Sequence, residues 1–151
     1  MVPDAIEREI VIDAPPTVVW AIVTEARHLA GWFSDEAEID LRPGGRMLLT
    51  WHRHGTYEGR VETVDPPRLF VFRWQTREGA FSETNSTLVA MTLDAEEAGT
   101  RLRVVESGFA KLPWPDEERA RYAEGNARGW LTELNELRDH VAQVVAANRG
   151  R

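Results

Sequence analysis

The sequence contains no cysteine, a single lysine and no long apolar stretch. Because cysteine is absent, disulfides, thiol nucleophiles and thiolate metal sites are all excluded. No apolar run approaches the roughly 18 residues that a membrane-spanning helix requires. The N-terminal segment also lacks the basic stretch followed by an apolar one that marks an export signal. We therefore expect a cytoplasmic protein that does not associate with membranes.

Positive charge is scarce as well. The 25 Asp and Glu residues outnumber the 18 Lys and Arg residues, the formal net charge is −7, and Lys111 is the only lysine. Binding to a nucleic-acid backbone requires clustered cations that displace counterions. Nucleic acid is therefore not an expected partner.

Motifs that hold cofactors or metals are missing too. The sequence has no nucleophile elbow, no phosphate-binding loop and no dinucleotide fingerprint. His52 and His54 lie two residues apart at a predicted hairpin, but no third ligand stands at a recognisable metal-binding spacing. We predict no cofactor and no metal site, and we interpret both histidines as surface residues.

Tryptophan, in contrast, is present in excess. The 151 residues include six, at Trp20, Trp32, Trp51, Trp74, Trp114 and Trp130. Tryptophan is large and rigid and has one polar edge, so it fills cores and lines ligand cavities alike. The location of these side chains is therefore the main question that the sequence raises.

The length fits a single domain over residues 1–151, and hydrophobic periodicity divides it into three parts. A strand over residues 6–13 precedes two short helical segments, at 17–26 and 28–33. The period then changes to two and predicts six antiparallel strands, at 36–41, 46–52, 57–64, 69–74, 87–95 and 100–106. After a proline-bearing loop, a stripe at helical spacing predicts one long amphipathic helix of about thirty residues. Its apolar members are Trp130, Leu134, Leu137, Val141 and Val144.

These elements predict an α+β fold. The apolar face of the sheet must be covered, and the C-terminal helix is the only element long enough to cover it. We expect a curved antiparallel sheet wrapped around the long C-terminal helix, with two short helices after the first strand.

Short motifs are distributed in order along nearly the whole chain, among them IVIDAP at 10–15, PGGR at 43–46, VDPPRL at 64–69, SGF at 107–109 and GW at 129–130. Together they resemble the homologues of the activator of the heat-shock-protein-ninety ATPase, a family of the START-like (SRPBCC, helix-grip) superfamily. The resemblance implies a helix-grip fold with a cavity between the sheet and the C-terminal helix. Members of the superfamily use this cavity to bind lipids, polyketides, hormones or other apolar molecules, in some cases with catalysis.

The cavity would be lined by the side chains that share the inward parity of the strands, which is the parity of Phe72 and Trp74. Arg60 and Glu62 have the opposite parity and are expected on the solvated face. Trp, Tyr and Met mixed with one carboxylate are typical of an apolar pocket with few polar anchors, and a solid core is the alternative. The candidate ligand-binding residues are Trp32, Phe33, Met47, Trp51, Tyr57, Phe72, Trp74, Met91, Glu106, Asn126 and Trp130.

Three further positions have two interpretations each. A carboxylate such as Glu106 on an apolar strand face would hold its proton more tightly and suit acid–base work; alternatively, it reaches solvent or pairs with an arginine. Gly125 and Gly129 share one helix face and leave room for a ligand or for Trp32 and Phe33 to close against the helix; alternatively, they allow close backbone packing, or the helix starts after them. Trp114 forms a lip of the cavity, or it covers the core or contacts a second subunit in a homodimer.

Three functions remain open at this point. The first is binding of an apolar or aromatic small molecule, with the question of enzymatic activity undecided. The second is a protein-interaction module similar to chaperone regulators, although we expect no room in 151 residues for the additional domain of the eukaryotic co-chaperones. The third is a cyclase or hydrolase of the same superfamily, for which Glu106 is the one candidate catalytic residue.

Overall fold

The structure is a computed structural model that describes residues 2–76 and 80–149. Within them, seven strands form one antiparallel sheet in the order β1-β7-β6-β5-β4-β3-β2. The strands are β1 (Ala5–Ile12), β2 (Glu36–Ile39), β3 (Arg46–Trp51), β4 (Gly55–Asp65), β5 (Leu69–Gln75), β6 (Ser86–Glu96) and β7 (Gly99–Ser107). The helices are α1 (Pro16–Thr24), α2 (Ala26–Trp32), the short 3-10 helix η1 (Phe109–Lys111) and α3 (Asp116–Arg149).

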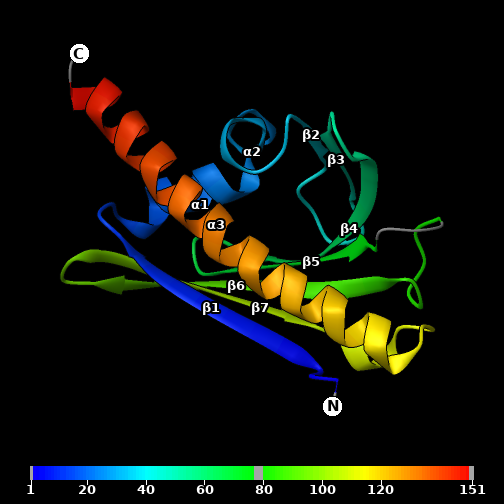
Figure 1. Cartoon of the computed structure of the whole chain (residues 1–151). Coiled ribbons are helices and arrows are strands. Elements are labelled where there is room, and N and C mark those ends of the chain that lie inside the picture. The colour runs from blue at the N-terminus through cyan, green and yellow to red at the C-terminus, as the bar shows by residue number, and fades with distance from the viewer. Residues whose placement is uncertain (1, 77–79, 150–151) are drawn as a thin grey trace.

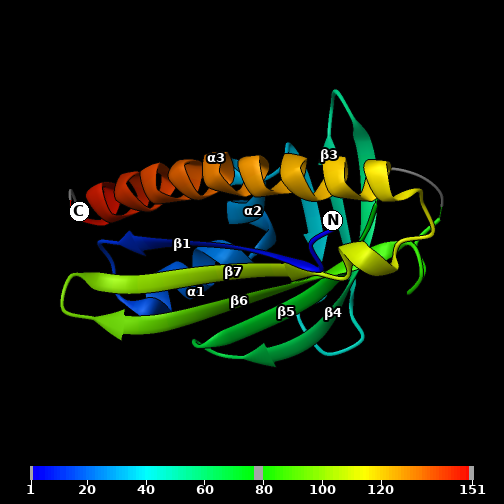
Figure 2. The ribbon, with the colours of Figure 1, turned by 60° about the horizontal axis from the view of Figure 1, so that its bottom comes forward.

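The sheet is a meander whose first and last strands meet. Strands β2 to β7 are neighbours in chain order, and β1 pairs with β7, with Ile6 opposite Glu106. Figure 1 shows α3 crossing the sheet diagonally, and Figure 2 shows β3 rising steeply from the sheet beside the helix. The predicted α+β helix-grip architecture is confirmed, because the curved sheet wraps around the C-terminal helix.

The core lies between the sheet and α3. Leu137 and Leu134 on the helix are 0% and 1% exposed, as the predicted stripe requires. Inward-facing strand residues meet them and are equally buried, namely Met47, Leu49, Val61, Phe70, Phe72, Val89, Met91, Leu93, Leu102 and Val104. A register shift between Val61 and Thr63 in β4 adds local twist, as bulges do, and so helps the sheet to curve.

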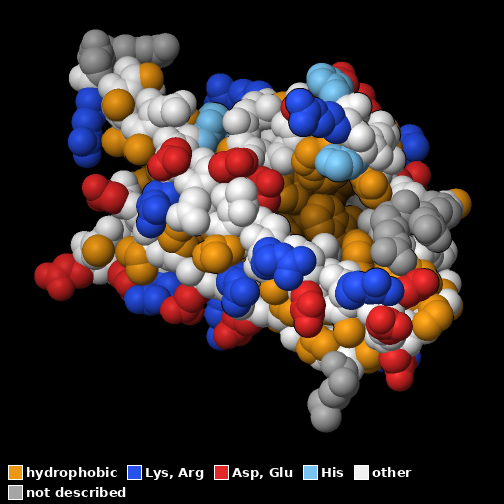
Figure 3. Space-filling view, in the orientation of Figure 1, with side chains coloured by type: hydrophobic (Ala, Val, Ile, Leu, Met, Phe, Trp, Pro, Cys, Tyr) orange, Lys and Arg blue, Asp and Glu red, His pale blue; other side chains and the backbone are white. Residues whose placement is uncertain are grey.

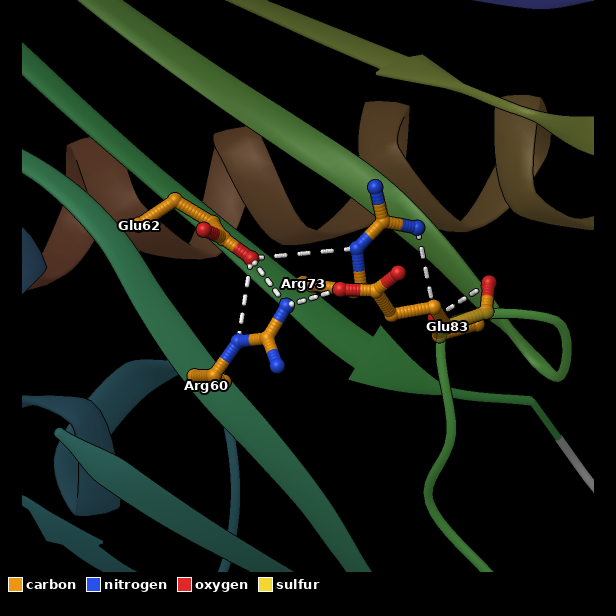
Figure 4. A network of polar contacts seen from close by, with 5 residues as sticks. Arg60, Glu62, Arg73 and Glu83 are labelled. Carbon is orange, nitrogen blue, oxygen red and sulfur yellow. Dashed lines mark hydrogen bonds and ion pairs between the residues drawn. The ribbon is translucent and has the colours of Figure 1, made fainter. Parts of the chain in front are cut away.

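The opposite face of the sheet is polar. Figure 4 shows Arg60 and Glu62 from β4 beside Arg73 from β5 and Glu83 from the loop before β6. Arg60 Nη2 lies 2.9 Å from Glu62 Oε1 and 3.0 Å from Glu83 Oε1. The predicted orientation of Arg60 and Glu62 is therefore confirmed.

The N-terminal helices differ from the prediction in their boundary. The segment at 17–26 was expected as one helix, but Glu25 has an extended backbone with ψ 135° and ends α1. The next helix, α2, begins at Ala26. Trp32 holds the two helices together, because its Nε1 donates a hydrogen bond to the carbonyl of Ile22 at 2.9 Å.

Among the described residues, no helix combines the length and the apolar character needed to cross a membrane. The long helix α3 is amphipathic, with Leu137 buried and Leu131 55% exposed.

These two leucines give a test of the core. We expect Leu137→Ala to lower the free energy of unfolding by about 2 to 5 kcal/mol, because it removes buried methyl groups and leaves a cavity under the helix. Leu131→Ala, the same change on the exposed side of α3, should alter it by less than about 0.5 kcal/mol. Chemical denaturation of both variants measures the difference, and equal effects would contradict the orientation of α3.

Candidate ligand-binding site

A hollow of about 450 Å³ opens between α3 and the β3–β4 hairpin. In Figure 3 it is visible as a depression with an apolar, orange floor. Its lining residues are Trp51, His54, Tyr57, Trp74, Gln75, Tyr122, Asn126, Gly129 and Glu133. A narrower recess of about 140 Å³ shares five of these residues and extends to Phe33 and Trp130. The larger volume lies in the range of small-molecule sites.

Three elements supply the lining. The hairpin contributes Trp51 at the end of β3 and Tyr57 near the start of β4, and β5 contributes Trp74 near its end. Helix α3 contributes the other wall through Tyr122, Asn126, Gly129 and Glu133. Their spacing of four, three and four residues places all four on one helix face.

The floor of the recess is a stack of aromatic rings. The ring of Phe33 is nearly parallel to that of Trp74, with centroids 5.6 Å apart, and to that of Trp130, with centroids 5.5 Å apart. Trp51 meets Phe33 edge-on at 5.5 Å, and Tyr57 meets Trp51 edge-on at 5.7 Å. Such pairs each stabilise a fold by about 0.5 to 1.5 kcal/mol beyond simple burial. The floor is therefore rigid.

Glu106 lies behind this stack and accepts hydrogen bonds from four side chains. Its Oε1 accepts from Trp130 Nε1 at 2.9 Å, and its Oε2 accepts from Trp74 Nε1 at 3.0 Å and from Thr87 Oγ1 at 2.6 Å. The amide nitrogen of Asn126 lies 3.1 Å from both oxygens. The carboxyl group thus fixes the orientation of two indole rings of the pocket wall.

Glu106 was expected, as an alternative to acid–base work, to reach solvent or to pair with an arginine, and the structure shows neither. Its side chain is 0% exposed, so it does not reach solvent, and its donors are neutral groups rather than an arginine. Burial in this apolar setting raises the pKa of Glu106, and the hydrogen bonds from Thr87, Trp74, Trp130 and Asn126 offset part of that increase. The group is also absent from the lining of the hollow, because the two indoles cover it.

The structure brings together six of the predicted ligand-binding residues: Phe33, Trp51, Tyr57, Trp74, Asn126 and Trp130. It places the other five elsewhere. Met47, Phe72 and Met91 are core residues that are at most 2% exposed. Trp32 is buried against Phe33 and hydrogen-bonded to Ile22, and Glu106 stands behind the wall. Periodicity predicts which face of a strand points inward, but it does not predict how far along the strand the core is filled.

The two helix glycines have open space around them. A Cβ built on Gly125 or Gly129 would meet no atom within 4 Å, so the alternative of close backbone packing is wrong. Gly129 lines the hollow and its recess. Gly125 faces a separate hollow beside Glu118 and Arg121. The missing side chain at 129 therefore keeps the cavity open against the helix.

Trp114 does not form a lip of this hollow. It is half-buried and meets Tyr122 edge-on at a centroid distance of 5.1 Å, in a small cluster with Phe109 and Leu112. Of the two other interpretations, the structure favours the one in which Trp114 covers the core, here the small separate cluster that contains Phe109 and Leu112. Trp114 acts on the hollow only indirectly, because it supports Tyr122.

Sequence reasoning missed Glu133, because this residue lies off the apolar stripe of the helix. It lines both the hollow and the recess, and its Oε2 is buried without a hydrogen-bond partner. Burial raises the pKa of Glu133 to about 8, and repulsion from Glu136 and a hydrogen bond that protonated Glu133 donates to Glu136 contribute to the increase. The spacing of 122, 126, 129 and 133 is the signal that could have identified this face.

The histidines of the hairpin have different surroundings. His52 is exposed and forms ion pairs with Asp35 and Glu36, at 3.7 and 3.1 Å, as expected of a surface residue. His54 is also exposed but stands at the mouth of the hollow. Over residues 2–76 and 80–149, no three His, Asp or Glu side chains are grouped to hold a metal ion.

Comparison with protein families identifies the relationship. The family described as "Activator of Hsp90 ATPase homolog 1-like protein" matches residues 13–142. The chain belongs to this family. It therefore also belongs to the START-like superfamily, as the ordered motifs predicted. No curated protein sequence matches the chain.

Solved structures share the fold across nearly the whole family domain. A protein of Mesorhizobium loti has a TM-score of 0.79 at 22% identity and covers 92% of this chain and 97% of its own. A protein of Bacillus halodurans has a TM-score of 0.73 at 27% identity, covering 93% and 99%. The Aha1 dimer of Colwellia psychrerythraea has a TM-score of 0.75 at 18% identity, covering 91% and 95%. At these identities the likeness concerns the fold.

Glu106 offers a test of the pocket wall. We expect Glu106→Gln to lower the free energy of unfolding by about 1 to 3 kcal/mol, because the amide NH₂ would replace one acceptor oxygen and face donors, so that at least one hydrogen bond to this side chain is lost. Glu7→Gln, on the exposed side of the neighbouring strand β1, should have little effect. Urea denaturation followed by tryptophan emission measures both, and an undiminished stability of the Glu106 variant would contradict this role.

Glu133 gives a pH dependence. Its pKa is about 8 in the folded protein instead of the ordinary 4.5, so the folded protein holds this proton where the unfolded chain has released it. Stability therefore falls as pH rises between these values. Glu133→Gln should be more stable than the unmodified protein at pH 8.5, by about 1 to 2 kcal/mol given the partial exposure, and similar at pH 4.

Denaturation curves at the two pH values measure this difference. Glu124→Gln, on the exposed side of the same helix, is the control and should show no such change with pH. A constant difference between the Glu133 variant and the unmodified protein would show that the carboxyl group is ionised normally.

Proposed function

We propose that this protein binds an apolar or aromatic small molecule in the hollow between α3, β5 and the β3–β4 hairpin. The observation that carries the proposal is an aromatic recess that stays open because Gly129 has no side chain. Flat ligands would pack against Trp51 and Trp74, which already offer ring faces and edges of the kind that aromatic molecules contact. Small-molecule sites are typically apolar clefts with a few polar groups.

Catalysis is not part of this proposal. The cyclase or hydrolase alternative relied on Glu106, and this carboxyl group is covered by Trp74 and Trp130 and is 0% exposed. A substrate would reach it only if those rings moved. Whether the chain is an enzyme therefore stays open, with no residue assigned to chemistry.

The protein-interaction alternative has less support in the described residues. Only Leu41 and Leu131 are large apolar side chains that are exposed there, whereas contiguous apolar patches larger than about 600 Å² mark interaction sites. The Colwellia relative is described as a dimer, and a homodimer therefore stays a prediction for this chain. The cytoplasmic location and the single domain over residues 1–151 also stay predictions.

The two helix glycines provide a matched test. We expect the neutral fluorophore N-phenyl-1-naphthylamine to bind the unmodified protein and to quench tryptophan emission by energy transfer. Gly129→Leu should weaken binding by at least about tenfold, because the new side chain enters the hollow. Gly125→Leu should leave binding unchanged, since position 125 lies outside this lining. Both substitutions remove a helix glycine, which favours the helix by about 1 kcal/mol.

Fluorescence titration of the three proteins gives the result. Equal binding by the two leucine variants would place the ligand elsewhere on the protein. Absence of binding by the unmodified protein would overturn the proposed function itself.

A further inference from the structure

The aromatic side chains of the hollow present ring surface and no free indole N–H. Trp51 Nε1 donates to the carbonyl of Phe33 at 2.9 Å. Trp74 Nε1 and Trp130 Nε1 donate to Glu106 at 3.0 and 2.9 Å. Since all three N–H groups are used behind the wall, a ligand in the hollow meets the π systems of these rings. The faces of aromatic rings carry partial negative charge and attract cations.

The lining of the hollow also includes a carboxyl group, which carries negative charge once it is ionised, above its pKa of about 8. Among the residues described around the hollow and its recess, Glu133 is the acidic one, and neither lysine nor arginine is present. Arg121 lines an adjoining hollow, which shares Tyr122 and Asn126 with this one. His54 also lines the hollow, and besides Glu133 it is the residue of this lining that carries an imidazole or carboxyl group. The lining therefore suits a positively charged ligand better than an anionic one.

One carboxyl oxygen of Glu133 has no hydrogen-bond partner in the structure. This oxygen, Oε2, is buried, and no ion pair of this residue occurs in the described part of the chain. Buried polar atoms are normally hydrogen-bonded, and an unsatisfied one is costly. The neighbouring Glu136 repels the ionised form of Glu133 and accepts a hydrogen bond only from the protonated form, so it does not compensate a negative charge there. A cation beside Glu133 would supply the missing compensation.

We propose that the hollow selects ligands that carry a quaternary or protonated ammonium group next to an aromatic or apolar body. The ammonium group lies against Glu133 and the ring surfaces of Trp51, Tyr57 and Trp74, and the apolar body enters the recess beside Phe33. This inference rests on the proposed function, because it assumes that the hollow is a binding site, and it adds the chemical class of the ligand.

A pair of isosteric probes tests the charge directly. Phenyltrimethylammonium and tert-butylbenzene have the same shape, and they differ in a charged nitrogen in place of a carbon. Displacement of N-phenyl-1-naphthylamine measures the affinity of each. At pH 9, where the carboxyl group of Glu133 is ionised, we expect the unmodified protein to bind the cation at least about tenfold more tightly than the neutral probe, as desolvated cation–π contacts and a facing carboxylate would produce.

Two variants test whether Glu133 causes the preference for the cationic probe. Glu133→Gln should reduce the preference for the cation to less than about threefold while keeping the affinity for tert-butylbenzene, because the amide retains the shape of the side chain and loses the charge. Glu124→Gln removes the same charge from the exposed side of α3 and should keep the full preference. Circular dichroism confirms that each variant is folded.

The outcomes separate this inference from the proposed function. Equal affinities of the unmodified protein for the two probes, or a preference for the neutral one, would overturn the inference and leave small-molecule binding intact. A full preference that persists in Glu133→Gln would also overturn it, because Glu133 would then not recognise the charge. Failure of both probes and of N-phenyl-1-naphthylamine to bind would overturn both proposals.

Discussion

The buried carboxyl group of Glu106 connects the elements that form the site. It lies on β7 and accepts hydrogen bonds from Trp74 on β5, Thr87 on β6, and Asn126 and Trp130 on α3. An unpaired carboxylate in this position would be strongly destabilising. Its burial is therefore possible only when three adjacent strands and the long helix are in place together, which makes the relation between sheet and helix specific.

The same interaction determines what the hollow offers to a ligand. Because Glu106 and the carbonyl of Phe33 bind the indole N–H groups from behind, the polar edges of Trp51, Trp74 and Trp130 are directed away from the hollow. The stack around Phe33 then forms a rigid, apolar floor. Glu133 stands at the opposite wall, on the helix face that Gly129 leaves open. A carboxyl group that a bound cation would help to ionise, placed over a preorganised aromatic surface, is the physical basis of the proposed ligand class.

Much of the fold was predictable because alternation and helical spacing are properties of neighbouring residues. The parity of Phe72 and Trp74 identified the buried face of the sheet, and the stripe through Leu134 and Leu137 identified the face of α3 that covers it. The site was predictable in part. Phe33, Trp51 and Trp130 line the recess, whereas Met47, Phe72 and Met91, which have the inward parity of their strands, are core residues. Position along a strand decides between these outcomes, and it depends on what packs opposite.

The sequence by itself determined that an antiparallel sheet would wrap around the last helix of the chain and that tryptophans would gather where sheet and helix meet. Periodicity suffices for this, because it dictates which side of each element must leave water. Only the tertiary structure decided that Glu106 is enclosed by four neutral donors and that Glu133 is turned toward a hollow. The charge state and accessibility of a carboxyl group depend on the atoms around it, and here those atoms come from residues 19 to 32 positions away for Glu106. Long-range packing alone brings them together.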